Sequence, residues 1–134
     1  MKRSKFIVSL ALVLLIAGNI IAVAQAANSA GYGYAYVGII DDYKTPLLTK
    51  QNSYEVGSNI VLDVQENRWL TCWIENIYGT NMTNKVNYNG PDKIYMNFKD
   101  PATGNQKLSI STYITNFTST GTMGKWSPDF ITTY

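Results

Sequence analysis

Histidine is absent from the 134 residues of this chain. Its absence removes the usual general base at neutral pH, the usual partner of a catalytic serine or cysteine, and the commonest zinc ligand. Cysteine occurs once, as Cys72, so no disulfide can form within the chain. Because Cys72 lies in an apolar segment, we expect a buried thiol that packs as a small hydrophobic group. We predict neither a cofactor nor a bound metal.

Charged residues are also few, and part of the positive charge lies at the N-terminus. Of the 11 Lys and Arg, three are Lys2, Arg3 and Lys5, while all 9 Asp and Glu lie later in the chain. The remaining cations are scattered and form no basic run. Binding to nucleic acid depends on a concentration of Lys and Arg that releases counterions from phosphates. We therefore predict no nucleic-acid partner.

The N-terminal segment has the three parts of a secretory signal peptide. Residues 1–5 are basic, residues 6–17 are apolar except for Ser9, and Ala24-Gln25-Ala26 offers small residues for cleavage. The alternative is an uncleaved anchor over residues 6–24, which nearly reaches the length of a membrane-spanning helix; Gly18 and Asn19 weigh against it. We predict a signal-peptide helix in residues 1–26 and a single secreted domain in residues 27–134, which touches a membrane only before cleavage.

The rest of the chain has the pattern of an all-β protein. Apolar residues alternate with polar ones in several short segments, and no long segment has apolar residues at helical spacing. Because the connections are too short for helical crossovers, we expect a small antiparallel β-sandwich, favoured over a small barrel, with the strand order open. The expected strands cover residues 32–40, 60–65, 68–78, 83–88, 94–98, 108–114 and 121–126, with a loop or weak edge strand at 44–54.

The segment 68–78 is the most apolar of this region and is expected to be a central strand. Leu70, Cys72 and Ile74 would share one face, and Trp69, Trp73 and Ile77 the other. In the preceding strand, Ile60, Leu62 and Val64 would share the dry face.

Aromatic residues in two strands are the candidate binding residues. Tyr32, Tyr34 and Tyr36 would share one face about 6.6 Å apart, a row that can stack on sugar rings of a glycan or cell wall. Trp69 and Trp73, about 13 Å apart along a strand, could form two ends of a second platform. For both sets the favoured interpretation is packing in the interior.

Acidic residues offer weaker candidates. Asp41 and Asp42 with Asp63, or Asp100 with Asn105, could supply oxygen ligands for calcium, but neither set has a recognised spacing, and turn capping explains them more simply. Glycoside hydrolysis needs two carboxyl groups across a cleft, and no pair can be nominated. We predict that the protein is not an enzyme.

Three short motifs carry a resemblance. They are GYGYAYVG at residues 31–38, Trp-Ile-Glu-Asn at residues 73–76, and a Gly-x-Trp element that runs from Gly124 to Asp129. With the leader, they resemble a family of small secreted β-proteins of Gram-positive bacteria whose function is not established. The pattern is also loosely similar to lactococcin 972-type bacteriocins, which act on cell-wall synthesis; those are shorter when mature and rich in histidine, so no activity is transferred to any residue here.

The expected role is therefore that of a secreted, non-enzymatic interaction protein, bacteriocin-like or associated with the cell envelope. Its partner would be a macromolecule that the sequence does not identify. The alternative is a module that binds glycan or cell wall through an aromatic strand face. A hydrolase is the least favoured class.

Overall fold

The computed structural model describes residues 28–134 and confirms the all-β fold. The predicted signal peptide, residues 1–26, lies outside the described residues. The strands are β1 (Ala30–Val37), β2 (Tyr43–Lys44), β3 (Leu48–Thr49), β4 (Gly57–Val64), β5 (Leu70–Asn76), β6 (Val86–Tyr88), β7 (Asp92–Met96), β8 (Asn105–Thr112) and β9 (Thr120–Ser127). A single 3-10 turn, η1 (Gln65–Asn67), separates β4 from β5. Among the described residues there is no helix with the length and apolar character needed to span a bilayer.

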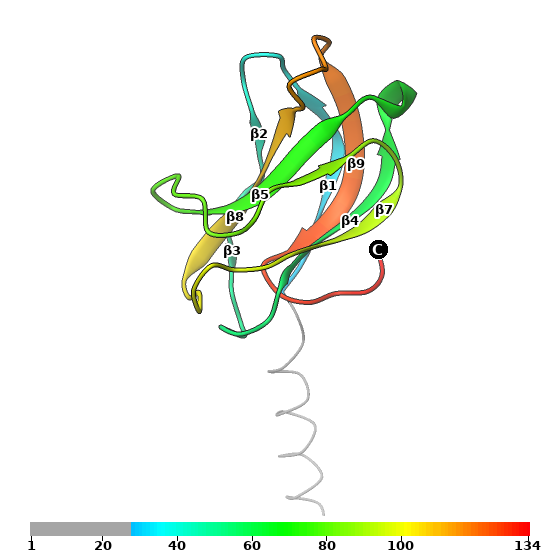
Figure 1. Ribbon diagram of the computed structural model, residues 1–134. Coiled ribbons are helices and arrows are strands. Elements are labelled where there is room, and N and C mark those ends of the chain that lie inside the picture. Colours follow the sequence, from blue (N-terminus) through cyan, green and yellow to red (C-terminus); the bar gives the residue numbers. More distant parts are fainter. Residues whose placement is uncertain (1–27) are drawn as a thin grey trace, which may run out of the picture.

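Two antiparallel sheets form the sandwich. One, here called the β9 sheet, has the strand order β1-β9-β4-β7. The other, the β5 sheet, has the order β2-β8-β5-β6, with β3 also paired to β8. Figure 1 shows the two sheets as two layers. The expected weak edge strand at 44–54 consists of the two-residue strands β2 and β3, which pair with β8.

The core lies between the two sheets and follows the alternation in the sequence. Leu70, Cys72 and Ile74 of β5 are completely buried, as the pattern predicts. Leu108 and Ile110 lie beside them on β8. The opposite layer contributes the buried apolar side chains Tyr32, Ala35, Val37, Val61, Val64, Ile94, Met96 and Trp126.

Two β-bulges alter the expected faces of the β9 sheet. In β1 the register shifts between Tyr32 and Ala35, and in β4 it shifts between Val61 and Asp63. An extra residue reverses the alternation beyond it, because side chains in a strand point to opposite faces with a period of two. The prediction that Leu62 shares the dry face is therefore wrong, since its side chain is 38% exposed.

Gly124 of β9 lies where the bulged strands approach closely. A Cβ at this position would collide with the ring of Tyr32 and with the carbonyl oxygen of Ile60. Only glycine leaves room for Tyr32 to turn into the core at this point.

A buried ion pair fastens the segment after β9 to the lower end of the sandwich in Figure 1. The side chains of Lys50 and Asp129 are 0% and 1% exposed, and their Nζ and Oδ1 atoms are 3.3 Å apart. Lys50 Nζ also donates to the carbonyl oxygens of Glu55 at 2.8 Å and Pro128 at 2.6 Å. It lies 4.3 Å from the ring centroid of Phe98. Three acceptors therefore match the three donors of the buried ammonium group.

The carboxylate of Asp129 is equally well satisfied. It accepts hydrogen bonds from the backbone N–H groups of Gln51 and Asn52, both at 2.9 Å. Burial lowers the pKa of Lys50, and the nearby charge of Asp129 opposes that shift. Because both charges are paired and hydrogen-bonded, this contact can hold the C-terminal segment in place without leaving an unsatisfied charge.

Candidate functional site

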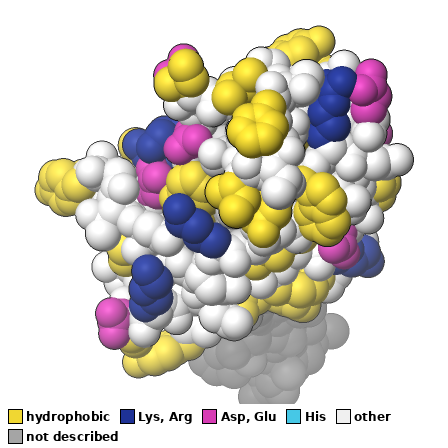
Figure 2. Space-filling model, turned by 45° about the horizontal axis from the view of Figure 1, so that its top comes forward, with side chains coloured by type: hydrophobic (Ala, Val, Ile, Leu, Met, Phe, Trp, Pro, Cys, Tyr) yellow, Lys and Arg dark blue, Asp and Glu magenta, His cyan; other side chains and the backbone are white. Residues whose placement is uncertain are grey.

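A groove lies on the outer face of the β5 sheet. Its volume is about 290 Å³, and it opens on the side that faces away from the core. Figure 2 shows hydrophobic and basic side chains near one another on the face that it presents. The lining residues come from β5, from β8 and the loop that follows it, and from β6 and the segment just before it: Thr71, Trp73, Lys85, Asn87, Ser111, Thr112, Tyr113 and Ile114.

Trp73 forms the inner wall of this groove. Its indole Nε1 donates a hydrogen bond to Glu75 Oε1 at 2.9 Å, which fixes the orientation of the ring. Lys85 Nζ lies 4.1 Å from the ring centroid, in a cation–π contact. With these neighbours the residue is only 6% exposed. Trp73 is buried, as predicted, but Lys85 covers it on the outer face and it is not part of the core cluster between the sheets.

Glu75 balances the positive charge on this face. Its Oε2 atom lies 2.7 Å from Lys44 Nζ and 4.0 Å from Lys107 Nζ. These side chains extend from three neighbouring strands of the β5 sheet, so the outer face carries more lysine than carboxylate. Lys85 is the charged residue that lines the groove itself.

Trp69 and Tyr113 form an aromatic pair beside the groove. Their ring centroids are 6.3 Å apart with an interplanar angle of 53°. The backbone N–H of Tyr113 donates to the carbonyl oxygen of Trp69 at 3.1 Å, so the segments that carry the two rings are linked. Trp69 is 45% exposed, which contradicts the favoured interpretation that it packs in the core. Trp69 precedes β5, and its ring packs against Tyr113.

The three tyrosines of β1 do not form a row. Tyr32 is 3% exposed and donates a 2.6 Å hydrogen bond to Asn59 Oδ1 inside the core. Burial raises the pKa of Tyr32 far above its ordinary value. Tyr34 and Tyr36 point outward and are 51% and 65% exposed. The predicted common face is wrong because the bulge in β1 falls between Tyr32 and Ala35.

Tyr34 and Tyr36 remain an exposed aromatic pair on the β9 sheet. Their ring centroids are 5.9 Å apart with an edge-to-face orientation. The ring of Tyr34 lies over Gly121 of β9, where a Cβ would collide with it. Two rings at the edge of the sheet offer a smaller platform than the predicted three.

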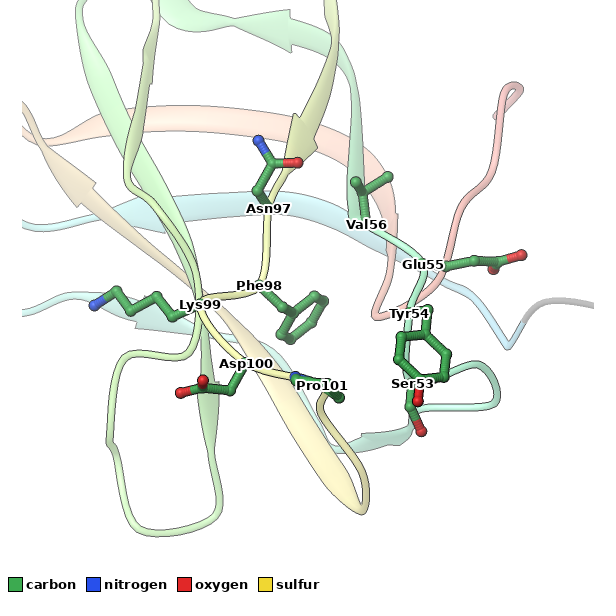
Figure 3. A pocket seen from close by; sticks show the side chains of 9 residues that line it. All are labelled: Ser53, Tyr54, Glu55, Val56, Asn97, Phe98, Lys99, Asp100 and Pro101. Atoms are coloured by element: carbon green, nitrogen blue, oxygen red, sulfur yellow. The ribbon is translucent and has the colours of Figure 1, made fainter.

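A second pocket, of about 210 Å³, lies near the buried ion pair. Figure 3 shows the ring of Phe98 pointing toward the segment that carries Ser53 and Tyr54, while the side chain of Lys99 points away. The charged side chains of this pocket do not converge on a common point. This pocket is a gap between loops of the lower end. Because its charged side chains do not converge, we take the groove of the β5 sheet as the candidate site.

Groups suited to nucleophilic or metal chemistry are scarce in residues 28–134. Burial raises the pKa of Cys72 to about 12, so the thiolate that would react is suppressed. No group of three or more His, Cys, Asp or Glu in the described part of the chain is arranged to hold a metal ion. The arrangement of the groove favours binding by stacking and hydrogen bonding.

Sequence reasoning missed several residues of the groove. Ser111 and Tyr113 alternate with apolar residues in the predicted strand 108–114, so the sequence contained a signal for them. Lys85 and Asn87 carried no such signal, because only the pairing of β6 with β5 places them beside Trp73.

Comparison with known proteins gives no match: no family model, curated protein or solved structure is significantly similar to this chain. The resemblance to small secreted β-proteins therefore stays a prediction.

Proposed function

We propose that this protein is an exported, non-enzymatic binding module that takes a carbohydrate chain in the groove of the β5 sheet. The groove between Trp73 and Tyr113 is the observation that carries the proposal. Aromatic rings offer apolar faces to the C–H groups of sugars, while neighbouring polar side chains can bond to their hydroxyl groups. The signal-peptide pattern of residues 1–26 supports an extracellular location, where glycans of the cell envelope are accessible.

The polar lining suits such a ligand. Ser111 supplies a hydroxyl group. The Thr71 hydroxyl donates to Asn87 Oδ1 at 2.7 Å, which leaves the Asn87 N–H groups to donate to a ligand and the Thr71 oxygen to accept from it. These side chains extend from three adjacent strands, so they form a rigid array. Lys85 covers Trp73 from the solvent side, so a sugar ring reaches the indole face when this exposed side chain swings aside.

The lysine content of the face indicates which glycans fit. Lys44 and Lys107 lie near the carboxylate of Glu75, and Lys85 lies over the ring of Trp73, so three lysines accompany one carboxylate. Complementary charge raises the association rate and excludes partners of like charge. Neutral glycans and those with carboxylate groups are therefore favoured over cationic ones.

Binding to defined polysaccharides tests the proposal. Purified protein lacking the leader would be mixed with insoluble peptidoglycan, chitin and β-glucan, and the bound fraction measured after sedimentation. Affinity should fall roughly tenfold or more in Tyr113→Ala and Trp69→Ala, because exposed aromatic anchors dominate binding energy. Tyr34→Ala is the matched control, since that exposed ring lies on the other sheet.

The outcomes separate the candidate faces. Loss of binding in Tyr34→Ala with Tyr113→Ala unaffected would move the site to the tyrosine pair of β1. Absence of binding to all three polysaccharides and to their soluble oligosaccharides would reject the carbohydrate proposal.

A further inference from the structure

Three connections meet at the upper end of the sandwich in Figure 1. They are the cyan loop after β1 (residues 38–42), the orange loop before β9 (residues 113–119) and the green segment that contains η1 (residues 65–69). Strand pairing confirms that they are neighbours. Val37 pairs with Thr120, and Tyr43 pairs with Ile110, so the first loop lies beside the second. Arg68 Nη1 donates a hydrogen bond to the carbonyl oxygen of Ser119, and this bond links the segment 65–69 to the loop 113–119.

Large apolar side chains project from the tips of these loops. Ile40, Ile114 and Phe117 are 92%, 79% and 77% exposed, and Ile39 is 52% exposed. Single exposed apolar residues are normal on protein surfaces and need no explanation. Four exposed apolar residues on two adjacent loops, at one end of a small domain, do need an explanation. Figure 2, which turns this end toward the viewer, shows hydrophobic side chains as separate groups among polar atoms.

Aromatic residues lie behind these tips. Tyr36 is 65% exposed near the end of β1, and Trp69 is 45% exposed beside Tyr113. Aliphatic and phenyl groups thus lie at the tips, and Trp and Tyr lie behind them. Side chains have the same order across the boundary between lipid chains and water. The amphipathic rings suit the headgroup level, and the aliphatic groups suit the hydrocarbon beyond it.

The loop before β9 is well ordered by hydrogen bonds. Asn116 Nδ2 donates to the carbonyl oxygen of Trp69 at 3.1 Å and to Thr120 Oγ1 at 3.0 Å. Asn116 Oδ1 accepts from the backbone N–H of Thr118 at 3.0 Å. These bonds satisfy polar groups of the loop internally, so its apolar side chains are presented to solvent by a defined structure.

The sequence predicts membrane contact only before cleavage of the leader. From the exposed loop tips we propose instead that the upper end of the domain inserts these tips shallowly into the surface of a lipid bilayer. The apolar side chains stand on separate tips, and a fluid lipid phase accepts separate protrusions without a matched pocket for each. A protein partner would need a complementary cavity at every tip. Ile114 also lines the groove, but Ile40 and Phe117 do not, so variants at these two positions separate membrane contact from carbohydrate binding.

The charges of this end specify the kind of bilayer. Asp41 and Asp42 adjoin the isoleucine tip, and Arg68 is paired with Glu66. The three loops contain no lysine, so they offer no attraction to anionic headgroups. The hydrophobic effect must drive insertion, and the favoured surface is a zwitterionic one such as phosphatidylcholine.

Vesicle flotation tests this proposal with residues 27–134, which contain the whole described fold. The protein should float with phosphatidylcholine vesicles, and added salt should leave the bound fraction unchanged. Ile40→Ser and Phe117→Ser should each weaken binding roughly tenfold, from the transfer energy of one large apolar side chain. Ile77→Ser is the matched control, because this isoleucine is 51% exposed in the turn after β5, at the opposite end.

Other outcomes overturn it. Failure of the wild-type protein to bind these vesicles, or equal weakening by Ile77→Ser, rejects insertion by the upper loops. Binding that appears only with anionic vesicles at low salt points to electrostatic adsorption. A wild-type dimer that Ile40→Ser converts to monomers, without any vesicle binding, would make this end an interface between copies. Because Ile40→Ser leaves the groove intact, polysaccharide binding distinguishes failure of this proposal from failure of the proposed function.

Discussion

The two ends of this sandwich differ in which side chains they bury and which they expose. At the lower end, the segment after β9 folds back, and Lys50 and Asp129 are paired out of contact with water. At the upper end, Ile40 and Phe117 project into solvent, and the ion pair of Arg68 with Glu66 lies at the surface. The lower end is built to close the fold, whereas the upper end leaves apolar surface free. Stability and interaction are thus expected to depend on different ends.

The largest effect is expected from breaking the lower ion pair. Asp129→Ala should lower the free energy of unfolding by about 3 to 5 kcal/mol, because it leaves the Lys50 ammonium buried without its counter-charge. Urea denaturation followed by circular dichroism measures the change. Glu66→Gln, which breaks the surface pair at the upper end, should cost less than about 1 kcal/mol. Equal losses in the two variants would contradict the proposed difference between the ends.

The core between the two ends should weaken in alkali. Burial raises the pKa of Cys72 from 9.0 to about 12, so the unfolded chain loses its thiol proton at a lower pH than the folded chain. The free energy of unfolding should therefore fall as pH rises through this interval. Near pH 11, the loss caused by Cys72 is on the order of 2 to 3 kcal/mol. Urea denaturation of the wild type and of Cys72→Ala across this pH range isolates the effect of the thiol on stability. A difference between the two proteins that does not vary with pH would refute the assignment.

A smaller loss is expected from removing the polar support of the upper end. Asn116→Ala deletes the hydrogen bonds that tie its loop to Trp69 and Thr120, and each neutral bond contributes about 1 kcal/mol. We expect a loss of about 1 to 2 kcal/mol in urea denaturation, together with faster amide exchange in residues 113–119. Unchanged exchange in this loop would show that other contacts order it.

The smallest effect is expected at the exposed tips. Ile40→Ser and Phe117→Ser should change the free energy of unfolding by no more than about 0.5 kcal/mol, because neither side chain packs against the core. Thermal unfolding is a sufficient measurement. A loss of several kcal/mol in either variant would mean that the tip supports the fold and is not a free surface.

Part of this architecture could be predicted from the pattern of side chains. The alternation of Leu70, Cys72 and Ile74 predicted their buried face, and the short connections predicted an antiparallel fold. The bulge between Tyr32 and Ala35 could not be predicted in the same way, because it depends on how β1 meets β9. For that reason the three-tyrosine face was wrong although each residue lies in the expected strand.

The candidate site shows the same division. Trp73, which lines the groove, and Trp69, which lies beside it, were named from the sequence. The groove is also lined by Lys85 from the segment before β6 and Tyr113 from the segment after β8. Contacts between residues distant in the sequence depend on strand order, which the alternation of single strands does not encode. The ion pair of Lys50 with Asp129 joins positions even farther apart and had no local signal.

The sequence by itself determined the all-β character, the buried face of β5 and the absence of histidine chemistry, because these depend on residue type and a local period of two. Only the tertiary structure decided which tyrosine turns inward, which charges are buried together and which loops share one end. Those outcomes depend on strand pairing and bulges, where segments far apart in the chain fix one another's register.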